Sequence, residues 1–270
     1  PVSRTGRQGT ANQSYSMSAV DDYGPVIDTL YDYARDAGLT IDTLIQEDGA
    51  GQVEINLSHG DPLLLADQAF YFKRIIREAA LNHDMFATFM AKPFGDIAGN
   101  GMHVHCSLVD KGGNNVFDDG TGQGTELLRQ AIAGCLYTMA DSMLMFAPNL
   151  NSYRRFRRGP HAPLAPTWGY ANRTVSVRVP ADSPVATRIE HRVAGADGSC
   201  RSYFSGLDHR VHCGQQKTGP PRLPCGCILI LRPVFVVSIV SSARGWCAAW
   251  LCPRGDQDLS CKRRAHYQCV

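Results

Sequence analysis

One stretch organises the fold of this chain: Gly99-Asn100-Gly101-Met102-His103-Val104-His105-Cys106-Ser107-Leu108. Its alternation of apolar and polar side chains after the two glycines predicts a β-strand. The even-numbered side chains share one face and suit a hydrophobic core, whereas His103, His105 and Ser107 share the other face and suit a polar ligand. The alternative is a half-buried strand whose histidines are merely solvated, because so short a motif is ambiguous on its own.

The composition describes a soluble globular protein whose two parts differ. The chain has 270 residues, 44% of them apolar, and a formal net charge of +2, which suits one large or two ordinary domains. Residues 1–199 carry 17 Lys and Arg, 22 Asp and Glu, and two cysteines. Residues 200–270 carry 10 Lys and Arg, 3 Asp and Glu, and eight cysteines. So few cysteines in the first part predict a cytoplasmic protein without a disulfide framework.

Neither end of the chain predicts a targeting or membrane segment. The first residues show no apolar signal region and no transit pattern. The lack of an initiator Met indicates that residues are missing upstream, and residues 1–22 are polar and predict a loop. The apolar segment 228–251 is interrupted by Arg232, Pro233 and Arg244, so no membrane span is expected.

Local patterns predict strands separated by helices. Capping residues and helical spacing of apolar residues predict helices from Gly24-Pro25 to Gly38, from Asp61-Pro62 to Asn82 and over 125–146. Strands are expected over 41–46, 52–57, 86–90, 102–108, 174–179 and 188–193, and the Gly-rich segment 48–51 predicts a hairpin turn between the first two. This order predicts an α+β fold with a largely antiparallel sheet.

Charged residues on or beside these strands predict a site for a metal and a phosphate. Carboxylates with one imidazole suit Mg²⁺ or Mn²⁺, and this set is Glu47, Glu54, Glu190 and His103. Arginines grip phosphate and carboxylate groups with their planar forks, and this set is Arg155, Arg173, Arg178, Arg188 and Arg192. Phosphoryl transfer needs both kinds of group. For any single residue, an exposed surface ion pair is the alternative.

Four motifs in this order resemble the glutamine synthetase family. Residues 100–108 resemble its Gly-Met-His-x-His-x-Ser-Leu motif, and 149–155 resemble its Asn-Pro-x-x-Asn-Ser-Tyr-Lys-Arg segment. Residues 172–180 and 188–192 resemble its Asn-Arg and Arg-Ile-Glu-x-Arg motifs, and Glu47 and Glu54 stand where the family has a glutamate pair around a hairpin. The resemblance covers about residues 23–197, and implies a partial catalytic domain with a curved, largely antiparallel sheet and packed helices.

The resemblance also implies roles for the matched residues. The metal ligands would be Glu47 and Glu54 for one ion, and His103 and Glu190 for a second. The ATP contacts would be His105, Ser107 and Arg188. The glutamate contacts would be Gly99, Arg155 and Arg192. The transferred phosphoryl group and ADP would meet Arg173 and Arg178, which have opposite strand parity, so one of them is expected outside the strand or across a bulge.

The family reaction implied here is an ATP-dependent ligation. ATP phosphorylates the γ-carboxylate of glutamate, and ammonia or an amine then displaces the phosphate. The family active site lies between neighbouring subunits, so the intact protein is expected to be a homo-oligomer. His161 stands where the family has a flap glutamate. With the spacing of Glu47 and Glu54, this resembles the branch that couples glutamate to amines or polyamines.

Two further features depart from the family pattern. Nothing before Tyr23 matches the family's β-grasp domain or its strand with two more metal-ligand glutamates, so each metal would lose a ligand. After Asp197 the family continues with a long apolar helix, whereas here a Cys- and Arg-rich tail, residues 198–270, begins. We interpret this as a reading-frame change. The tail is expected to lack a stable core, to dock poorly on the preceding domain and, through its β-prone run 234–240, to aggregate.

The alternative function is a catalytically inactive fragment whose basic tail binds metal or nucleic acid. The tail cysteines Cys225, Cys227, Cys247 and Cys252 fit none of the common zinc spacings. Positive charge alone binds nucleic acid without specificity. Nucleic acid is therefore not an expected partner.

Overall fold

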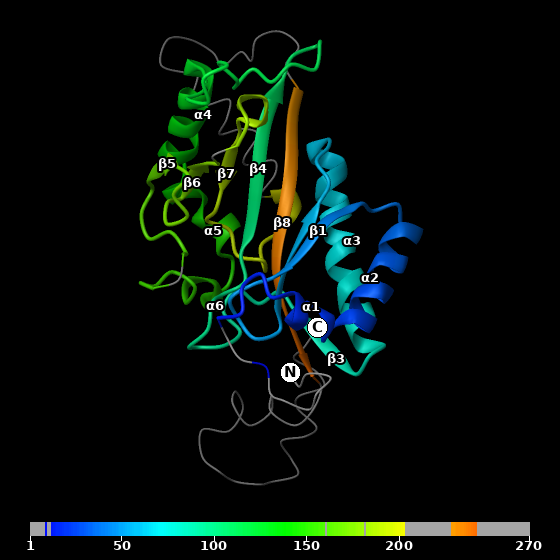
Figure 1. Cartoon of the computed structure of the whole chain (residues 1–270). Helices are drawn as coiled ribbons and strands as arrows, with labels where there is room; N and C mark the ends of the chain where they lie inside the picture. The colour runs from blue at the N-terminus through cyan, green and yellow to red at the C-terminus, as the bar shows by residue number, and fades with distance from the viewer. Residues whose placement is uncertain (1–8, 10–11, 160, 181, 203–227, 242–270) are drawn as a thin grey trace.

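The computed structural model describes residues 9, 12–159, 161–180, 182–202 and 228–241. In these residues an 8-stranded sheet forms the centre of the structure. Figure 1 shows β4 and β8 side by side in the middle of this sheet, with α2 and α3 towards one edge and α4 towards the other.

The strands pair in the order β1-β2-β8-β4-β7-β6-β5, and β3 pairs with the remaining part of β8. Their bounds are β1 Ile41–Gln46, β2 Gln52–Leu57, β3 Met85–Thr88, β4 Met102–Val109, β5 Trp168–Tyr170, β6 Val177–Val179, β7 Ile189–His191 and β8 Ile228–Ser241. All of these pairs are antiparallel except β5 with β6, which is parallel. The prediction of an α+β fold with a largely antiparallel sheet is confirmed.

The α-helices are α1 Met17–Asp21, α2 Gly24–Asp36, α3 Pro62–Leu81, α4 Glu126–Tyr137, α5 Met143–Phe146 and α6 Leu150–Tyr153, and short 3₁₀ turns span Ala140–Ser142 and Pro184–Ala186. The long helix α3 begins where the sequence predicts. The Asp61 carboxylate accepts hydrogen bonds of 3.0 Å from the backbone N–H groups of Leu63 and Leu64, and Pro62 follows at the first helical position. The inner face of α3 packs into the core, where Phe72 and Ile76 are fully buried.

The single helix predicted over 125–146 was wrong in its extent. It ends at Tyr137, and a 3₁₀ turn separates it from α5. The Thr138 hydroxyl donates to the Gly134 carbonyl at 2.9 Å, and the Ser142 hydroxyl donates to the Thr138 carbonyl at 2.7 Å. Such side-chain bonds compete with the helical ladder and favour its interruption.

For residues 228–241, strand β8 contradicts the expectation that residues beyond about Cys200 dock poorly. It lies between β2 and β4 in the sheet and contributes Leu231, Phe235 and Val237 to the buried core. The Phe235 ring lies 5.4 Å from that of Phe72 and 6.2 Å from that of Phe89, measured between centroids. Both faces of β8 are buried, which requires a continuous apolar run. The β-prone segment 234–240, which suggested aggregation, therefore pairs with strands of its own chain.

The rest of the tail is not described. Cys225, Cys227, Cys247 and Cys252 lie outside the described residues, and the reading-frame change stays a prediction. Among the helices that the structure does describe, none combines the length and the apolar character needed to cross a membrane.

Candidate active site

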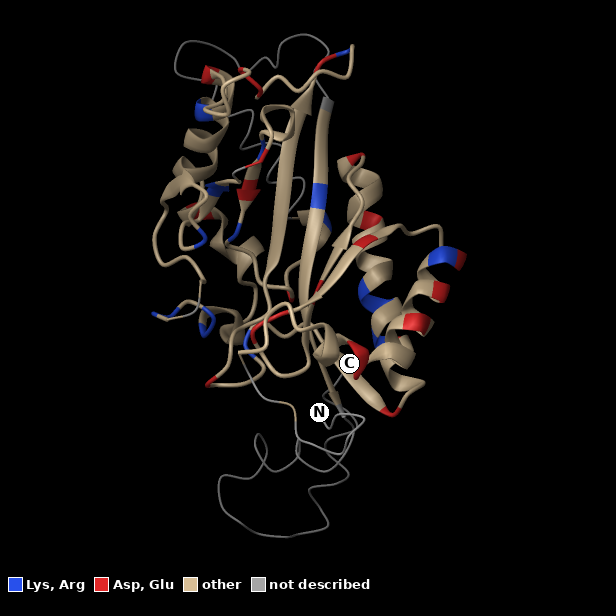
Figure 2. Ribbon diagram, in the orientation of Figure 1, with Lys and Arg blue, Asp and Glu red and all other residues tan. Residues whose placement is uncertain are grey.

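Strand β4 carries the predicted site residues on one face. Its even-numbered residues are fully buried in the core, whereas His103, His105 and Ser107 are half-buried on the opposite face. Pairing places Glu190 of β7 opposite His105, and Arg178 of β6 opposite Glu190. Paired residues share a face of the sheet, so these groups form one polar row. Figure 2 shows the acidic and basic residues that gather along β7.

Glu190 is the centre of this row. Its carboxylate accepts from Arg178 Nη1 at 2.7 Å and from Arg192, and its Oε1 lies 3.3 Å from His103 Nδ1. Burial alone would raise the pKa of Glu190, but the contacts with His103 and Arg192 hold that pKa far below its usual range. Glu190 is therefore a buried anion at neutral pH.

Both motif histidines are held neutral. Burial lowers the pKa of His103 to about 4, and the Arg192 cation beside it acts in the same direction. Burial lowers the pKa of His105 to about 3, and Arg188, whose Nε donates to His105 Nδ1 at 2.8 Å, adds to that effect. A neutral imidazole keeps a lone pair for a metal or a hydrogen bond.

The β1–β2 hairpin brings the predicted glutamate pair together. The Glu47 backbone N–H donates to the Gln52 carbonyl at 2.8 Å, and Glu54 lies two residues further along the same face of β2. Burial and the adjacent Glu47 carboxylate raise the pKa of Glu54 to about 7, and Glu190 contributes to this rise. The two predicted ligand pairs therefore act on each other across the same face.

Strand β8 runs between these two pairs. The register places Val236 opposite Glu54 and Val234 opposite His103. Further along β8, Arg232 lies opposite His105 and forms an ion pair with Asp42. The side chains that separate the two predicted metal pairs are thus valines, which supply no ligand.

The two pairs fit a divalent cation unequally. Adjacent carboxylates that repel each other suit a hard cation, which would neutralise both. By contrast, both Glu190 oxygens accept from arginines and one faces His103, so these contacts have to open for an ion to enter. Within the described residues, no group of three or more His, Cys, Asp or Glu side chains is arranged to hold a metal. Water and phosphate oxygens would complete the coordination, as is usual for Mg²⁺.

Arg155 lies beside the same site and anchors its backbone. It is only 4% exposed, and its Nη1 and Nη2 donate to the carbonyls of Val193 and Arg192 at 2.6 and 2.9 Å. A Cβ at Gly99 would lie 2.5 Å from the Ala91 carbonyl oxygen and 3.0 Å from Arg155 Cγ. The glycine is therefore needed for the loop to pass between them.

The other predicted arginines differ in how they are held. Arg188 pairs with Asp182 at 2.6 Å as well as with His105. Arg173 lies outside β6, as its parity with Arg178 predicts, and its Nη1 donates to the hydroxyl of Tyr15 at 3.0 Å. His161 is exposed in the irregular segment before β5.

Sequence reasoning missed the polar groups that hold the site in place. Asn100 is fully buried and accepts from Gln52 Nε2 at 2.8 Å and from Ser238 Oγ at 3.0 Å, so it ties the loop before β4 to β2 and β8. The position of Asn100 between Gly99 and Gly101 could have identified it in the sequence as a residue that holds the site in place. Nothing comparable in the sequence identifies Tyr15 or Asp182.

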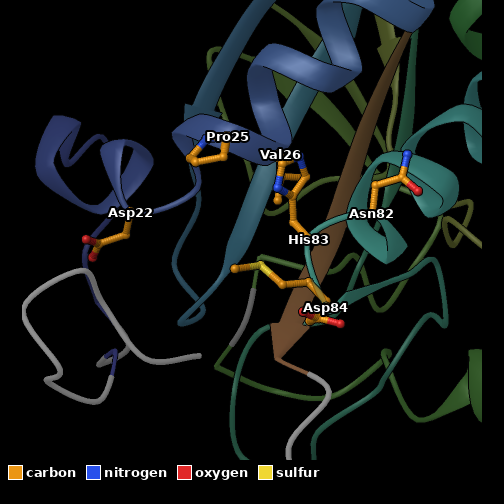
Figure 3. Close-up of a pocket in the computed structure, with 7 residues that line it drawn as sticks. Asp22, Pro25, Val26, Asn82, His83 and Asp84 are labelled. Carbon is orange, nitrogen blue, oxygen red and sulfur yellow. The ribbon is translucent and has the colours of Figure 1, made fainter.

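Two cavities in the described part lie away from these residues. One of about 390 Å³, shown in Figure 3, is lined by Asp22, Pro25, Val26, Asn82, His83, Asp84 and Met85. The other, of about 800 Å³, lies between α3 and the segment after Asp197 and includes Phe70, Lys73 and Cys200. Neither is lined by a predicted site residue.

One pair of carboxylates, two neutral histidines and the arginines on Glu190 lie on one face of the sheet, and such a set suits a phosphate group and a divalent cation. The protein-family model for the glutamine synthetase catalytic domain matches residues 1–205 of this sequence. This chain belongs to the glutamine synthetase family.

Individual relatives agree with this assignment. Gamma-glutamylputrescine synthetase PuuA of Escherichia coli (strain K12) is 40% identical over 210 residues, which cover 76% of this chain and 44% of that protein. Glutamate–isopropylamine ligase of a Pseudomonas species is 36% identical over 199 residues, covering 73% of this chain and 42% of that protein. The solved structure of GmaS without ligand superposes with a TM-score of 0.69 at 28% identity, covering 81% of this chain and 51% of that one. The chain spans less than half the length of these two sequence relatives.

Proposed function

We propose that this chain is part of the catalytic domain of an ATP-dependent ligase that joins glutamate to an amine or ammonia through a γ-glutamyl phosphate. The observation that carries the proposal is the single sheet face on which Glu54, His103 and Glu190 lie. Arg178 shares this face, and Arg192 contacts Glu190 there. The identity to γ-glutamyl amine ligases supports it.

Each residue keeps the role that its motif implies. When bound, Mg²⁺ or Mn²⁺ would neutralise phosphate charge and polarise the phosphoryl oxygens, held by Glu47 and Glu54 and by His103 and Glu190. The nucleotide would be contacted by His105, Ser107 and Arg188. Glutamate would be held by Gly99, Arg155 and Arg192.

The arginines near Glu190 supply the positive charge that the first step needs. A γ-carboxylate oxygen of glutamate attacks the terminal phosphorus of ATP, and ADP leaves with the bonding electrons. Arg173 and Arg178 would stabilise the charge that develops on the transferred group. In the second step the amine nitrogen attacks the γ-carbon, phosphate leaves, and the nitrogen loses a proton.

An amine is the proposed acceptor, because His161 replaces the anionic flap residue that would attract ammonium. The relatives named above act, by their names, on putrescine and isopropylamine. A homo-oligomer is proposed for the whole protein. A cytoplasmic location remains a proposal based on the few cysteines in residues 1–199.

A second candidate, an inactive fragment, is favoured by one observation: valines of β8 separate the two ligand pairs. We therefore expect the 270-residue chain to bind substrates but to release phosphate far more slowly than the usual ~1–10³ s⁻¹. Calorimetric titration with MgATP, and with glutamate in its presence, tests the proposal. Binding of neither ligand would support the inactive fragment, and amine-dependent turnover within the usual range would contradict the expected slow rate.

A further inference from the structure

Tyr15 lies outside every matched motif, yet it contacts one of the predicted catalytic arginines. Its phenolic oxygen accepts a hydrogen bond of 3.0 Å from Arg173 Nη1. The two residues are separated by 158 positions in the sequence. The contact therefore depends on the fold and not on local geometry.

The backbone around Tyr15 is attached to the hairpin that bears Glu47. The Asn12 N–H donates to the Asp48 carbonyl at 2.7 Å, and the Tyr15 N–H donates to the Gln46 carbonyl at 2.8 Å. The Ser16 hydroxyl then caps α1 by accepting from the Ala19 N–H at 3.3 Å. These bonds fix Tyr15 next to the glutamate pair.

The conformation of Tyr15 is itself unusual. Its φ is +66°, in the left-handed region that bulky residues rarely adopt. Such conformations persist only where the surroundings over-determine them, and they concentrate at functional sites. Here the backbone bond to β1 and the phenol bond to Arg173 supply those constraints.

Arg173 is exposed in the loop before β6, and no carboxylate of the described residues forms an ion pair with it. The hydrogen bond to Tyr15 is the largest cause that raises the pKa of its guanidinium, and the carboxylates of Glu190 and Glu47 act on that pKa in the same direction. If the guanidinium bound either carboxylate directly, it would occupy a predicted metal ligand. A neutral phenol oxygen can hold the guanidinium without neutralising it.

We propose that Tyr15 is a positioning residue for Arg173, holding its guanidinium over the Glu47 end of the site so that it meets the phosphoryl group. The inference rests on the proposed function, which gives Arg173 its role. It adds a residue from the N-terminal segment to that site.

The first test measures the hydrogen bond without any substrate. The full chain is treated with phenylglyoxal, and modification of Arg173 is measured by peptide mass spectrometry relative to Arg157. Tyr15→Phe should raise the modification rate of Arg173 roughly three- to tenfold, the range expected for loss of one hydrogen bond. Tyr170→Phe is the matched control, because the Tyr170 hydroxyl donates to the Gln123 carbonyl at 2.6 Å and does not reach Arg173. An unchanged rate in Tyr15→Phe would overturn the proposal.

The second test measures coupling by calorimetric titration with MgADP. Tyr15→Phe should weaken binding roughly three- to tenfold, and it should add nothing once Arg173 is replaced in Arg173→Ala. Wild-type binding with additive losses in the double variant would refute the positioning role alone. Failure of the wild-type chain to bind MgADP would refute the proposed function, and the positioning role with it.

Discussion

Replacing Phe235 by alanine should unfold the protein at much lower denaturant concentration, because β8 is part of the core. The Phe235 side chain is fully buried, and its ring packs against Phe72 and Phe89 at 5.4 and 6.2 Å between centroids. The Lys73 ammonium lies 5.6 Å from the same ring. Truncation of such a phenylalanine removes burial and leaves a cavity, which costs about 3–5 kcal/mol. In a protein of this size that loss lowers Tm by roughly 6–20 °C.

The measurement is urea unfolding of Phe235→Ala beside a matched control, Phe86→Ala. Phe86 lies on the neighbouring strand β3, but it is 47% exposed and should cost under about 1 kcal/mol. Equal and small losses in the two variants would mean that residues 228–241 do not pack between β2 and β4. The placement of β8 in the sheet would then be wrong.

Two further substitutions test the site. Arg192→Lys keeps the positive charge but loses the planar guanidinium that contacts Glu190 and approaches His103. The affinity for glutamate, measured by calorimetry, should therefore fall roughly tenfold. An unchanged affinity would refute the role of Arg192. Val236→Glu places a third carboxylate opposite Glu54, so the variant should be less stable than wild type without metal but gain more in Tm from Mn²⁺. Equal Mn²⁺ effects on the two proteins would show that Val236 does not face the Glu47–Glu54 pair.

Elements with strong local signals were predicted well from the sequence. Strands β1 and β2 follow the predicted bounds because a Gly-rich turn joins two β-prone runs. Helix α3 follows them because Asp61 and Pro62 mark its start. The family resemblance also implied that His103 and Glu190 would meet at one metal, and their side chains lie 3.3 Å apart.

Features that depend on distant partners were not predictable in this way. The apolar segment of β8 has the same β propensity whether it pairs within the sheet or aggregates. Its pairing with β2 and β4, which are distant in the sequence, decides between the two outcomes. The contact between Tyr15 and Arg173 depends on the fold of the whole chain. Arg155 shows a related limit, since its motif identified the residue but not the backbone carbonyls that its guanidinium binds.

Binding of Mn²⁺ tests most directly the claim that strand-borne carboxylates form a cation site. Electron paramagnetic resonance titration would compare wild type with Glu54→Gln and with Glu126→Gln, whose carboxylate lies on the surface and pairs with Arg129 at 3.0 Å. Loss of a charged ligand should weaken Mn²⁺ binding by roughly tenfold or more in Glu54→Gln, since even the loss of a residue that only supports a metal ligand typically costs ~10–100-fold in metal affinity. Glu126→Gln should match wild type. Equal affinity in all three proteins, or no Mn²⁺ binding by the wild-type chain, would contradict the cation site.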